Sequence, residues 1–467
     1  MSTKKYSPLV RRINRRDFLK GMTGAGLALG FGGLTGCVVQ QSPPAPAPVE
    51  EAPATTEAEA MPATEINLDF VVWSYSIETI LDNIKLFEEQ YPGYKVNLTD
   101  YSWTAYRETM VNRFTSKTAT DVAYSGGDWL PEWAKAGWLV PLEDYFPQVK
   151  EYAPKIVGYA LKDMTYDGKL YGLPYYADIT SFLYNEKLLT ENGIEKPAES
   201  WEELADQLKF LQDKGMAAPM ALEFAQAMPT TLENFTAMVF GRGGEFFNEK
   251  FDVLFNEENS AAWQQLQWLA DQYAAKAITL LPHETDVVKA LNTGSHIYTV
   301  LYNYNLAELN NTATSPLAGQ YKLALMPGET HETYGFAKFY TMTQMAVDRG
   351  QDVMDAAWKF IEYFGGEHEG QYKVAKRWAV EKGLGFGQLP LYDDPDVQKS
   401  FAQWIDPVML KEQAQKARGR NQTVWYGIWA EFMRLELVRA VTGETTVAEA
   451  MQAAADKAEE LKAQFAG

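Results

Sequence analysis

The chain has 467 residues, more than one hydrophobic core usually serves, so two lobes are expected. Hydrophobic residues make up 46% of it and aromatic residues 13%, which is the composition of a folded protein rather than a disordered one. The formal net charge of -20 argues against nucleic acid and polyanionic ligands, which require a basic surface, and favours a neutral or cationic solute.

Residues 1–36 are predicted to be an export signal. Arg11, Arg12, Arg15 and Arg16 precede a short apolar stretch rich in glycine and alanine, as in bacterial signal peptides. The run Arg15-Arg16-Asp17-Phe18-Leu19-Lys20 resembles the twin-arginine export motif, which a receptor reads. This segment carries seven basic side chains and one acidic, so its removal leaves a chain with a net charge of -26.

The signal ends in Leu34-Thr35-Gly36-Cys37, which resembles the bacterial lipobox, with Cys37 as the lipidated first residue of the mature protein. Cys37 is the only cysteine, so an internal disulfide and a cysteine metal or redox site are excluded. Residues 37–64 are rich in Pro, Ala and Glu and are predicted to form a disordered linker. We therefore expect an exported lipoprotein of the cell membrane that faces the periplasm or the extracellular space.

The chain then alternates between strand and helix patterns. Strands are predicted over 66–75, 94–103 and 120–129, and helices over 77–91 and 104–116. This alternation predicts a mainly parallel α/β sheet.

Each of these predicted strands ends in aromatic residues. They are Trp73 and Tyr75, then Tyr101 and Trp103, then Trp129 beside Asp128. Ligands of such sheets bind beyond the carboxyl ends of the strands, so these side chains are candidate ligand contacts. Packing against a helix is the alternative for each of them.

The next stretch, residues 167–189, reads DGKLYGLPYYADITSFLYNEKLL. Tyr175, Tyr176 and Asp178 lie where the chain leaves a tight turn, after a helix and turn over 133–146. The pattern fits either a half-buried strand or a ligand-facing crossover between two lobes. Ser200 and Glu203 then fit a capping box that opens a helix over 201–215.

A second α/β block follows. It contains strands over 218–224 and 294–305, further strands over 321–328 and 336–347, and helices over 232–244, 260–276 and 352–366. Its strands end in Glu223 and in Tyr302, Asn303 and Tyr304. The last quarter is mostly helical and closes with a second capping box at Thr446 and Glu449.

Catalytic and cofactor motifs are missing from the sequence. The four histidines are scattered and lack zincin spacing, and Ser125 lies in an incomplete nucleophile elbow without an obvious histidine partner. No phosphate loop is present, and Gly24 and Gly26 mimic a dinucleotide-binding fingerprint only inside the signal, where no strand precedes them. We expect no cofactor, no metal and no enzymatic activity, although a glycoside hydrolase needs only a carboxylate pair and stays an alternative.

The motifs at 167–174, at 183–189 and at 200–204 resemble those of the extracellular solute-binding proteins of ABC importers, the family typified by maltose- and oligosaccharide-binding proteins. Glu186 stands where the family usually has lysine. The resemblance implies the two-lobed α/β fold of type II periplasmic binding proteins, whose hinged lobes are discontinuous. We expect the crossovers at 175–180 and 334–341, an N-terminal lobe of 65–177 plus 334–380, and a C-terminal lobe of 178–333 plus 381–467.

This resemblance implies a monomeric substrate-binding lipoprotein that captures a solute between the lobes and delivers it to permease subunits. A sugar is favoured, because aromatic rings cover its C–H face while carboxylates and amides bind its hydroxyls. The candidate ligand-binding residues are Trp73, Tyr75, Trp103, Asp128, Trp129, Tyr175, Tyr176, Asp178, Glu223, Tyr302, Asn303 and Trp425.

Two other ligands stay open. A cationic or peptide solute would use the same rings for cation–π contacts and the same acids for charge pairing. An amino acid would require an arginine for its carboxylate, and only Arg107 and Arg242 lie near predicted strand ends.

Overall fold

The computed structural model describes residues 65–465. The predicted signal (1–36), Cys37 and the predicted linker (37–64) lie outside the described residues. Within 65–465, no helix combines the length and the apolar character that crossing a bilayer requires.

The described strands are β1 (Ile66–Trp73), β2 (Tyr94–Tyr101), β3 (Val122–Gly126), β4 (Thr165–Tyr166), β5 (Lys169–Leu170), β6 (Gly172–Asn185), β7 (Met220–Glu223), β8 (Ile278–Leu281), β9 (Tyr298–Tyr302), β10 (Tyr321–Ala324), β11 (Thr333–Met342) and β12 (Ala417–Arg418).

The described helices are α2 (Ile77–Gln90), α3 (Trp103–Ser116), α4 (Leu130–Lys135), α5 (Leu142–Tyr145), η1 (Pro147–Lys155), α6 (Gly158–Asp163), α7 (Glu186–Glu191), α8 (Trp201–Asp213), α9 (Pro229–Gly241), α10 (Ala261–Ala274), α11 (Glu284–Leu291), α12 (Asn305–Leu309), α13 (Gln344–Asp348), α14 (Gln351–Gly365), α15 (Lys373–Lys382), η2 (Leu389–Asp393), α16 (Pro395–Phe401), α17 (Pro407–Lys416), α18 (Tyr426–Val441) and α19 (Val447–Gln464).

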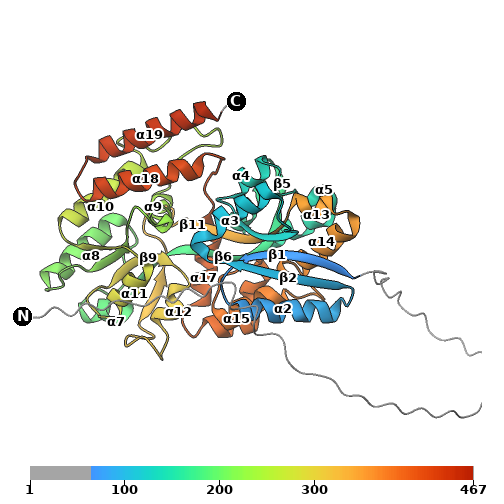
Figure 1. Cartoon of the computed structure of the whole chain (residues 1–467). Helices are drawn as coiled ribbons and strands as arrows, with labels where there is room; N and C mark the ends of the chain where they lie inside the picture. The colour runs from blue at the N-terminus through green and yellow to red at the C-terminus, as the bar shows by residue number, and fades with distance from the viewer. Residues whose placement is uncertain (1–64, 466–467) are drawn as a thin grey trace, which may run out of the picture. The chain divides into compact units, whose positions relative to one another are not determined.

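The strands of the main sheet lie in the order β2-β1-β3-β11-β6-β9-β7-β8, with β10 also pairing β6 and β12 pairing β11 (Figure 1). We call β2, β1 and β3 the β1 side of the sheet, and β9, β7 and β8 the β7 side. Strand β1 pairs parallel to β2 and β3, and β7 pairs parallel to β8 and β9, as the alternating pattern predicted. The two central strands run antiparallel to each other and to β3 and β9, which local periodicity does not reveal.

The central strands β6 and β11 connect the two sides. Residues 172–179 of β6 pair with β11, whereas from Thr180 onward the same strand pairs with β9. Strand β11 in turn pairs with β3. One 14-residue strand therefore belongs to both sides of the sheet.

The ladder between β6 and β11 contains a bulge at Tyr175. Lys338 pairs with Tyr176, but Phe339 pairs with Pro174, so Tyr175 is the extra residue. Proline lacks the N–H that a regular ladder requires and is found at such irregularities. Because a bulge re-aims the side chains around it, two consecutive tyrosines can contact each other here, with ring centroids 5.1 Å apart.

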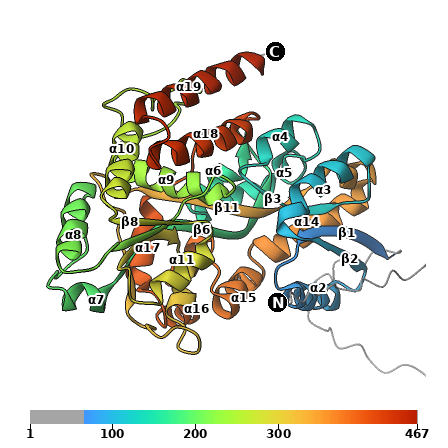
Figure 2. The same cartoon turned by 60° about the vertical axis from the view of Figure 1, so that its left-hand side comes forward.

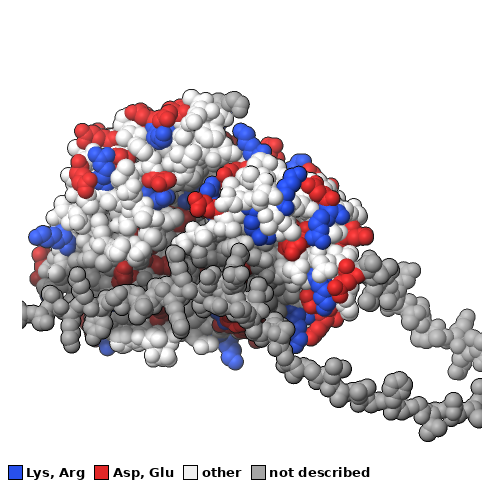
Figure 3. Space-filling model, viewed as in Figure 1, with Lys and Arg blue, Asp and Glu red and all other residues white. Residues whose placement is uncertain are grey.

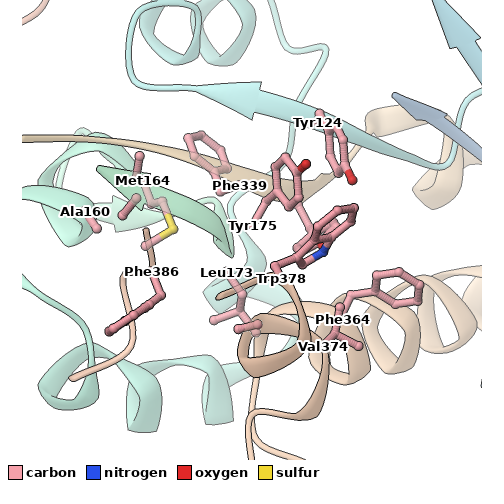
Figure 4. Close-up of a cluster of buried hydrophobic side chains, with 14 of the residues drawn as sticks. Tyr124, Ala160, Met164, Leu173, Tyr175, Phe339, Phe364, Val374, Trp378 and Phe386 are labelled. Atoms are coloured by element: carbon pink, nitrogen blue, oxygen red, sulfur yellow. The ribbon is translucent and has the colours of Figure 1, made fainter. Parts of the chain in front are cut away.

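Two hydrophobic clusters fill the protein. The first contains side chains of β1, β3, β11 and α14 and continues through α15, α16 and α17 to α11 and α12. Figure 4 shows part of it, where Tyr175 lies with Tyr124, Phe339 and Trp378. The second cluster contains α8, α9, α10, α18 and α19 on the β7 side. In the turned view of Figure 2, α18 and α19 again lie together beside α10.

The predicted elements differ from the observed ones mainly at their ends. Helix α3 begins at Trp103, so this residue opens a helix rather than ending a strand. The stretch predicted as one strand over 336–347 ends at Met342 and continues as α13. Strand β8 and helix α11 were not predicted.

Of the two predicted capping boxes, one forms completely and the other forms in part. The Thr446 and Glu449 capping box is complete. At α8, Ser200 accepts the Glu203 amide as predicted, but the Glu203 carboxylate accepts the amide of Glu199 instead of that of Ser200.

We predict that Phe70→Ala lowers the free energy of unfolding by about 3–5 kcal/mol, the usual cost of emptying a buried aromatic site. Phe70 is 0% exposed and its ring lies 4.9 Å from that of Phe360 and 5.4 Å from that of Tyr124. Urea denaturation provides the measurement. Leu86→Ala on the outer face of α2, where Leu86 is 45% exposed, is the control and should cost less than ~0.5 kcal/mol. Equal losses in the two variants would contradict this core.

Candidate functional site

The carboxyl ends of the parallel strands place most of the predicted residues together. Trp73 ends β1, and Asp128 and Trp129 follow β3 on the β1 side. Glu223 ends β7, and Tyr302 ends β9 with Asn303 next, on the β7 side. Tyr175, Tyr176 and Asp178 lie on β6 between the two sides.

A series of aromatic rings crosses the sheet from one side to the other. On the β1 side, Trp103 lies 5.6 Å from Trp129, which lies 6.3 Å from Trp73. The Trp73 ring is 5.7 Å from that of Tyr175, which contacts Tyr176. These centroid distances are in the range of aromatic pairs.

The series continues on the β7 side through a residue that the sequence did not single out. The Tyr176 ring lies 5.9 Å from Phe336 on β11, and Phe336 lies 5.0 Å from Tyr302. Tyr302 lies 5.7 Å from Tyr304. We call these eight rings the aromatic series: Trp103, Trp129, Trp73, Tyr175, Tyr176, Phe336, Tyr302 and Tyr304.

The members of the aromatic series differ in how much surface they offer. Trp103 is 49% exposed, and Tyr176 and Tyr304 are half-buried. Tyr175 is only 2% exposed and stacks on Tyr124 with ring centroids 4.4 Å apart, so most of its ring is buried in the first hydrophobic cluster. The rings accessible to a solute are therefore those of Trp103, Tyr176 and Tyr304.

Two predicted aromatic residues do not join the aromatic series directly. Tyr75 is exposed and its ring neighbour is Trp378, 6.1 Å away. Trp425 is buried in the second cluster against Phe247 and Phe251, at 5.6 and 5.8 Å. Trp425 packs there as a core residue because it immediately precedes α18, whose inner face the second cluster covers.

A lysine from β11 completes the tryptophan end of the site. Lys338 Nζ lies 2.6 Å from Asp128 Oδ1, 4.8 Å from the centre of the Trp129 ring and 5.5 Å from that of Trp103. Gly126 makes room for this contact, because a Cβ there would lie 2.5 Å from Asp128 Oδ1 and 2.6 Å from Lys338 Nζ. The sequence had not indicated Lys338.

The β7 side supplies carboxylates that follow its strands. Glu233 lies in the early part of α9 and accepts a hydrogen bond from the Tyr302 hydroxyl. Glu284 begins α11 and accepts from the Tyr304 hydroxyl at 2.6 Å. Both were missed, although the strand-end rule applied to β7 and β8 leads to the helices that follow these strands.

Arg420 is a second buried cation of this region, beside Lys338, and was also missed. Its guanidinium lies 4.8 Å from the Tyr334 ring centre and 4.9 Å from that of Tyr426, and 3.5 Å from a Glu233 oxygen. The arginines considered from the sequence pair elsewhere, Arg107 with Glu132 and Arg242 with Glu202.

A polar pocket of about 130 Å³ lies beside Arg420. Its lining includes Gly127, Asp163, Phe251, Arg420 and Gln422. This volume is smaller than the ~300–1,000 Å³ of small-molecule sites. Over the face seen in Figure 3, acidic and basic side chains are interspersed.

Three carboxyl groups near the aromatic series have strongly shifted pKa values. Burial raises the pKa of Asp163 to about 7, opposed by the Ala337 amide and by Arg420 and Lys338. Burial raises the pKa of Asp178 to about 7, opposed by hydrogen bonds from the amides of Ile179 and Tyr304. Burial also raises the pKa of Glu223 to about 7, and the charges of Glu284 and Glu233 add to the shift.

Within residues 65–465, the serine of the incomplete nucleophile elbow is buried and no cluster of metal ligands is present. Ser125 lies inside β3 with no exposed surface, and no group of His, Cys, Asp or Glu in this part of the chain could hold a metal ion. Of the histidines, His331 contacts the Met326 carbonyl oxygen and His296 that of Ala218. The arrangement instead offers aromatic faces flanked by hydrogen-bonding groups, as a binding site does.

We predict that Asp163→Asn changes the pH dependence of stability. Between the unfolded pKa of about 3.9 and the folded value, the folded state holds a proton that the unfolded state has lost, so Asp163 lowers the free energy of unfolding as pH rises through this window. In this window, the free energy of unfolding of the variant should rise relative to that of the wild type by up to ~1.4 kcal/mol for each pH unit. Denaturant titrations from about pH 4.5 to about 7.5 measure this; the exposed Asp206→Asn is the control, and parallel curves for wild type and Asp163→Asn would contradict the prediction.

The fold is shared with solved binding proteins. The sugar-binding protein MalE of Xanthomonas citri superposes with a TM-score of 0.73 at 19% identity, over 85% of this chain and 98% of that chain. The GacH receptor of Streptomyces glaucescens superposes with a TM-score of 0.70 at 20% identity, over 85% and 99%. The predicted two-lobed α/β fold of type II periplasmic binding proteins is confirmed by this likeness.

Sequence relatives match over shorter stretches. A maltotriose-binding protein of Pyrococcus abyssi is 26% identical over 322 residues, 64% of this chain and 62% of that protein. The diacetylchitobiose binding protein DasA of Streptomyces coelicolor is 24% identical over 158 residues, 34% and 35%. The match to a binding protein of Brucella abortus covers 37% of its length, so the chain spans less than two thirds of these curated relatives.

The family model described as bacterial extracellular solute-binding protein matches residues 73–370. This range begins at Trp73 of the aromatic series and includes both central strands. The resemblance seen in the motifs is therefore confirmed, and the chain belongs to the bacterial extracellular solute-binding proteins.

Proposed function

We propose that the protein captures a sugar at the aromatic series and delivers it to the permease of an ABC importer. The observation that carries this proposal is the continuous run of rings from Trp103 to Tyr304 across both sides of the sheet. Rings present flat apolar faces to the C–H side of a pyranose, and the carboxylates and amides beside them bind hydroxyl groups. The names of the maltotriose and diacetylchitobiose relatives and of MalE support a sugar.

The same arrangement supports capture by closure of two lobes. We propose that the lobes turn about 175–180 and 334–341, where β6 and β11 pass between the sides, with 65–177 plus 334–380 in one lobe and 178–333 plus 381–467 in the other. A solute that contacts rings from both lobes binds the closed form better, and this difference in affinity drives closure. A monomer that binds without chemical turnover is sufficient for this role.

A thermal-shift screen against mono- and oligosaccharides tests the proposal. A ligand at ~100 times its dissociation constant should add roughly 2.7 kcal/mol of stability. Polyamines and peptides are screened in parallel, and the sugars are analysed for smaller products afterwards. Stabilisation by peptides or simple polyamines alone would refute the proposal that the ligand is a sugar. Conversion of a sugar to smaller products would favour a glycoside hydrolase.

We predict that Trp103→Ala weakens binding of the sugar found in this screen by about ten- to a hundredfold, because burial of a large apolar side chain is worth ~1.5–3 kcal/mol. Titration calorimetry measures the affinity. Phe210→Ala on α8 is the matched control, since its ring is 40% exposed and lies outside the aromatic series. Undiminished affinity in Trp103→Ala would remove this ring from the site.

We further propose that the protein is held at the membrane by lipid on Cys37. The motif Leu34-Thr35-Gly36-Cys37 and the export signal before it support this, as does the extracellular role of the family. We predict that Cys37→Ser abolishes incorporation of labelled palmitate and moves the protein from the membrane to the soluble fraction of expressing cells. Membrane association that survives this substitution would contradict lipid anchoring.

A further inference from the structure

The aromatic series already holds one ammonium group at its tryptophan end. Lys338 Nζ pairs with Asp128 and faces the rings of Trp129 and Trp103. A carboxylate with aromatic faces is the environment in which ammonium groups bind through charge and cation–π attraction. At this end of the site, the chain supplies both partners itself.

The tyrosine end has the carboxylates without the cation. Within the part of the chain that the structure describes, Asp178, Glu223 and Glu284 form no salt bridge. Arg420 contacts Glu233 instead, at 3.5 Å. Carboxyl groups therefore outnumber the cations paired with them beside Tyr302 and Tyr304.

Glu223 is the most exceptional of these groups. Its side chain lies at the carboxyl end of β7 and is 1% exposed, yet neither carboxylate oxygen has a hydrogen-bond partner of good geometry among residues 65–465, and only the neighbouring Thr230 hydroxyl group opposes the rise of its pKa. The Asn303 Oδ1 atom, at the end of β9, also lacks a donor. A buried acceptor without a donor costs roughly 1–3 kcal/mol, and more when it is charged, so this cost implies a donor that arrives with the ligand.

Several of these carboxylates act on one phenol group, that of Tyr176. Burial raises the pKa of the Tyr176 hydroxyl group. The negative charges of Asp178, Glu233, Asp128 and Glu284 raise it further. Glu223 in turn experiences Glu284 and Glu233. Acids from both sides of the sheet therefore lie around the same half-buried phenol, but in the described residues they are not close enough together to hold a metal ion.

We propose that the solute is an amino sugar whose protonated amine binds between Glu223 and Glu284, beside the rings of Tyr302 and Tyr304. The inference rests on the proposed function and narrows its ligand class. An ammonium group provides three donors for the unpartnered oxygens and neutralises the surplus charge. A hydroxyl group would supply one donor and leave the charge uncompensated.

The experiment compares sugars that differ at a single position. Glucose, glucosamine and N-acetylglucosamine, and their β-1,4-linked di- and trisaccharides, carry a hydroxyl, an ammonium and an acetamido group at C2. Galactose and mannose with their 2-amino derivatives extend the comparison, and every other sugar that stabilises the full-length protein is tested with its amino derivative. We expect the amino form of the best ligand to bind about tenfold tighter or more than its hydroxyl and acetamido forms.

Glu223→Gln assigns the effect to the site, because glutamine keeps the shape and removes the charge. The amino sugar should lose about tenfold in affinity, and the neutral sugar less than about threefold. Glu284→Gln, which should act in the same direction, is the second variant if Glu223→Gln folds poorly, and Glu459→Gln on the exposed face of α19 is the control.

The outcomes separate the two proposals. The amino-sugar proposal is wrong if a neutral sugar binds as tightly as its amino form. It is also wrong if both Glu223→Gln and Glu284→Gln retain the preference for the amine. Either result leaves the proposed sugar-binding function intact. If no sugar of either kind binds, the proposed function fails, and the inference fails with it.

Discussion

Strands β6 and β11 pair along 172–179 and 335–341 in the middle of the sheet, and the side chains on this pair connect the rings of its two sides. Tyr175 contacts Trp73 of one side, Tyr176 contacts both Tyr175 and Phe336, and Phe336 contacts Tyr302 of the other side. The bulge at Tyr175 is the local irregularity that lets two consecutive residues of one strand take part in the same run of rings. A regular ladder would send alternate side chains to opposite faces and interrupt the aromatic series at this point.

This connection also explains why the site contains buried acids. Residues at the carboxyl end of β7 and in the early part of α9 lie beside the central pair, so Glu223 and Glu233 are largely withdrawn from water together with the rings, whereas Asp128 stays exposed. Burial of a carboxylate is unfavourable unless hydrogen bonds or cations compensate it. Lys338 compensates Asp128, Arg420 lies near Glu233, and amides compensate Asp178. Glu223 has no compensating cation or amide, only the Thr230 hydroxyl group, and such a local cost is of the kind that proteins retain at functional positions.

The distribution of exposed rings suggests a division of labour within the aromatic series. Tyr175 and Trp73 are buried in the first hydrophobic cluster, where they pack the central strands against β3 and α15. Trp103, Tyr176 and Tyr304 retain exposed surface at positions spread along the series. The buried rings thus fix where the accessible ones stand, and rigid placement of contact groups lowers the entropic cost of binding.

The sequence by itself determined the family, the alternation of parallel strands and helices, and the rule that places ligand contacts at strand ends, because all three depend on residues close together in the chain. It led to Trp73, Asp128, Trp129, Tyr176, Glu223 and Tyr302 for this reason. Only the tertiary structure decided that Lys338 pairs with Asp128, that Phe336 joins Tyr176 to Tyr302, and that Trp425 belongs to a core. The first two facts follow from the register of β11 against β3 and β6 and from the bulge at Tyr175, which bring together residues more than 100 positions apart. The place of Trp425 follows from the packing of α18 in the second cluster. Local pattern carries no information about such pairings, because the same strand would show the same periodicity beside any partner.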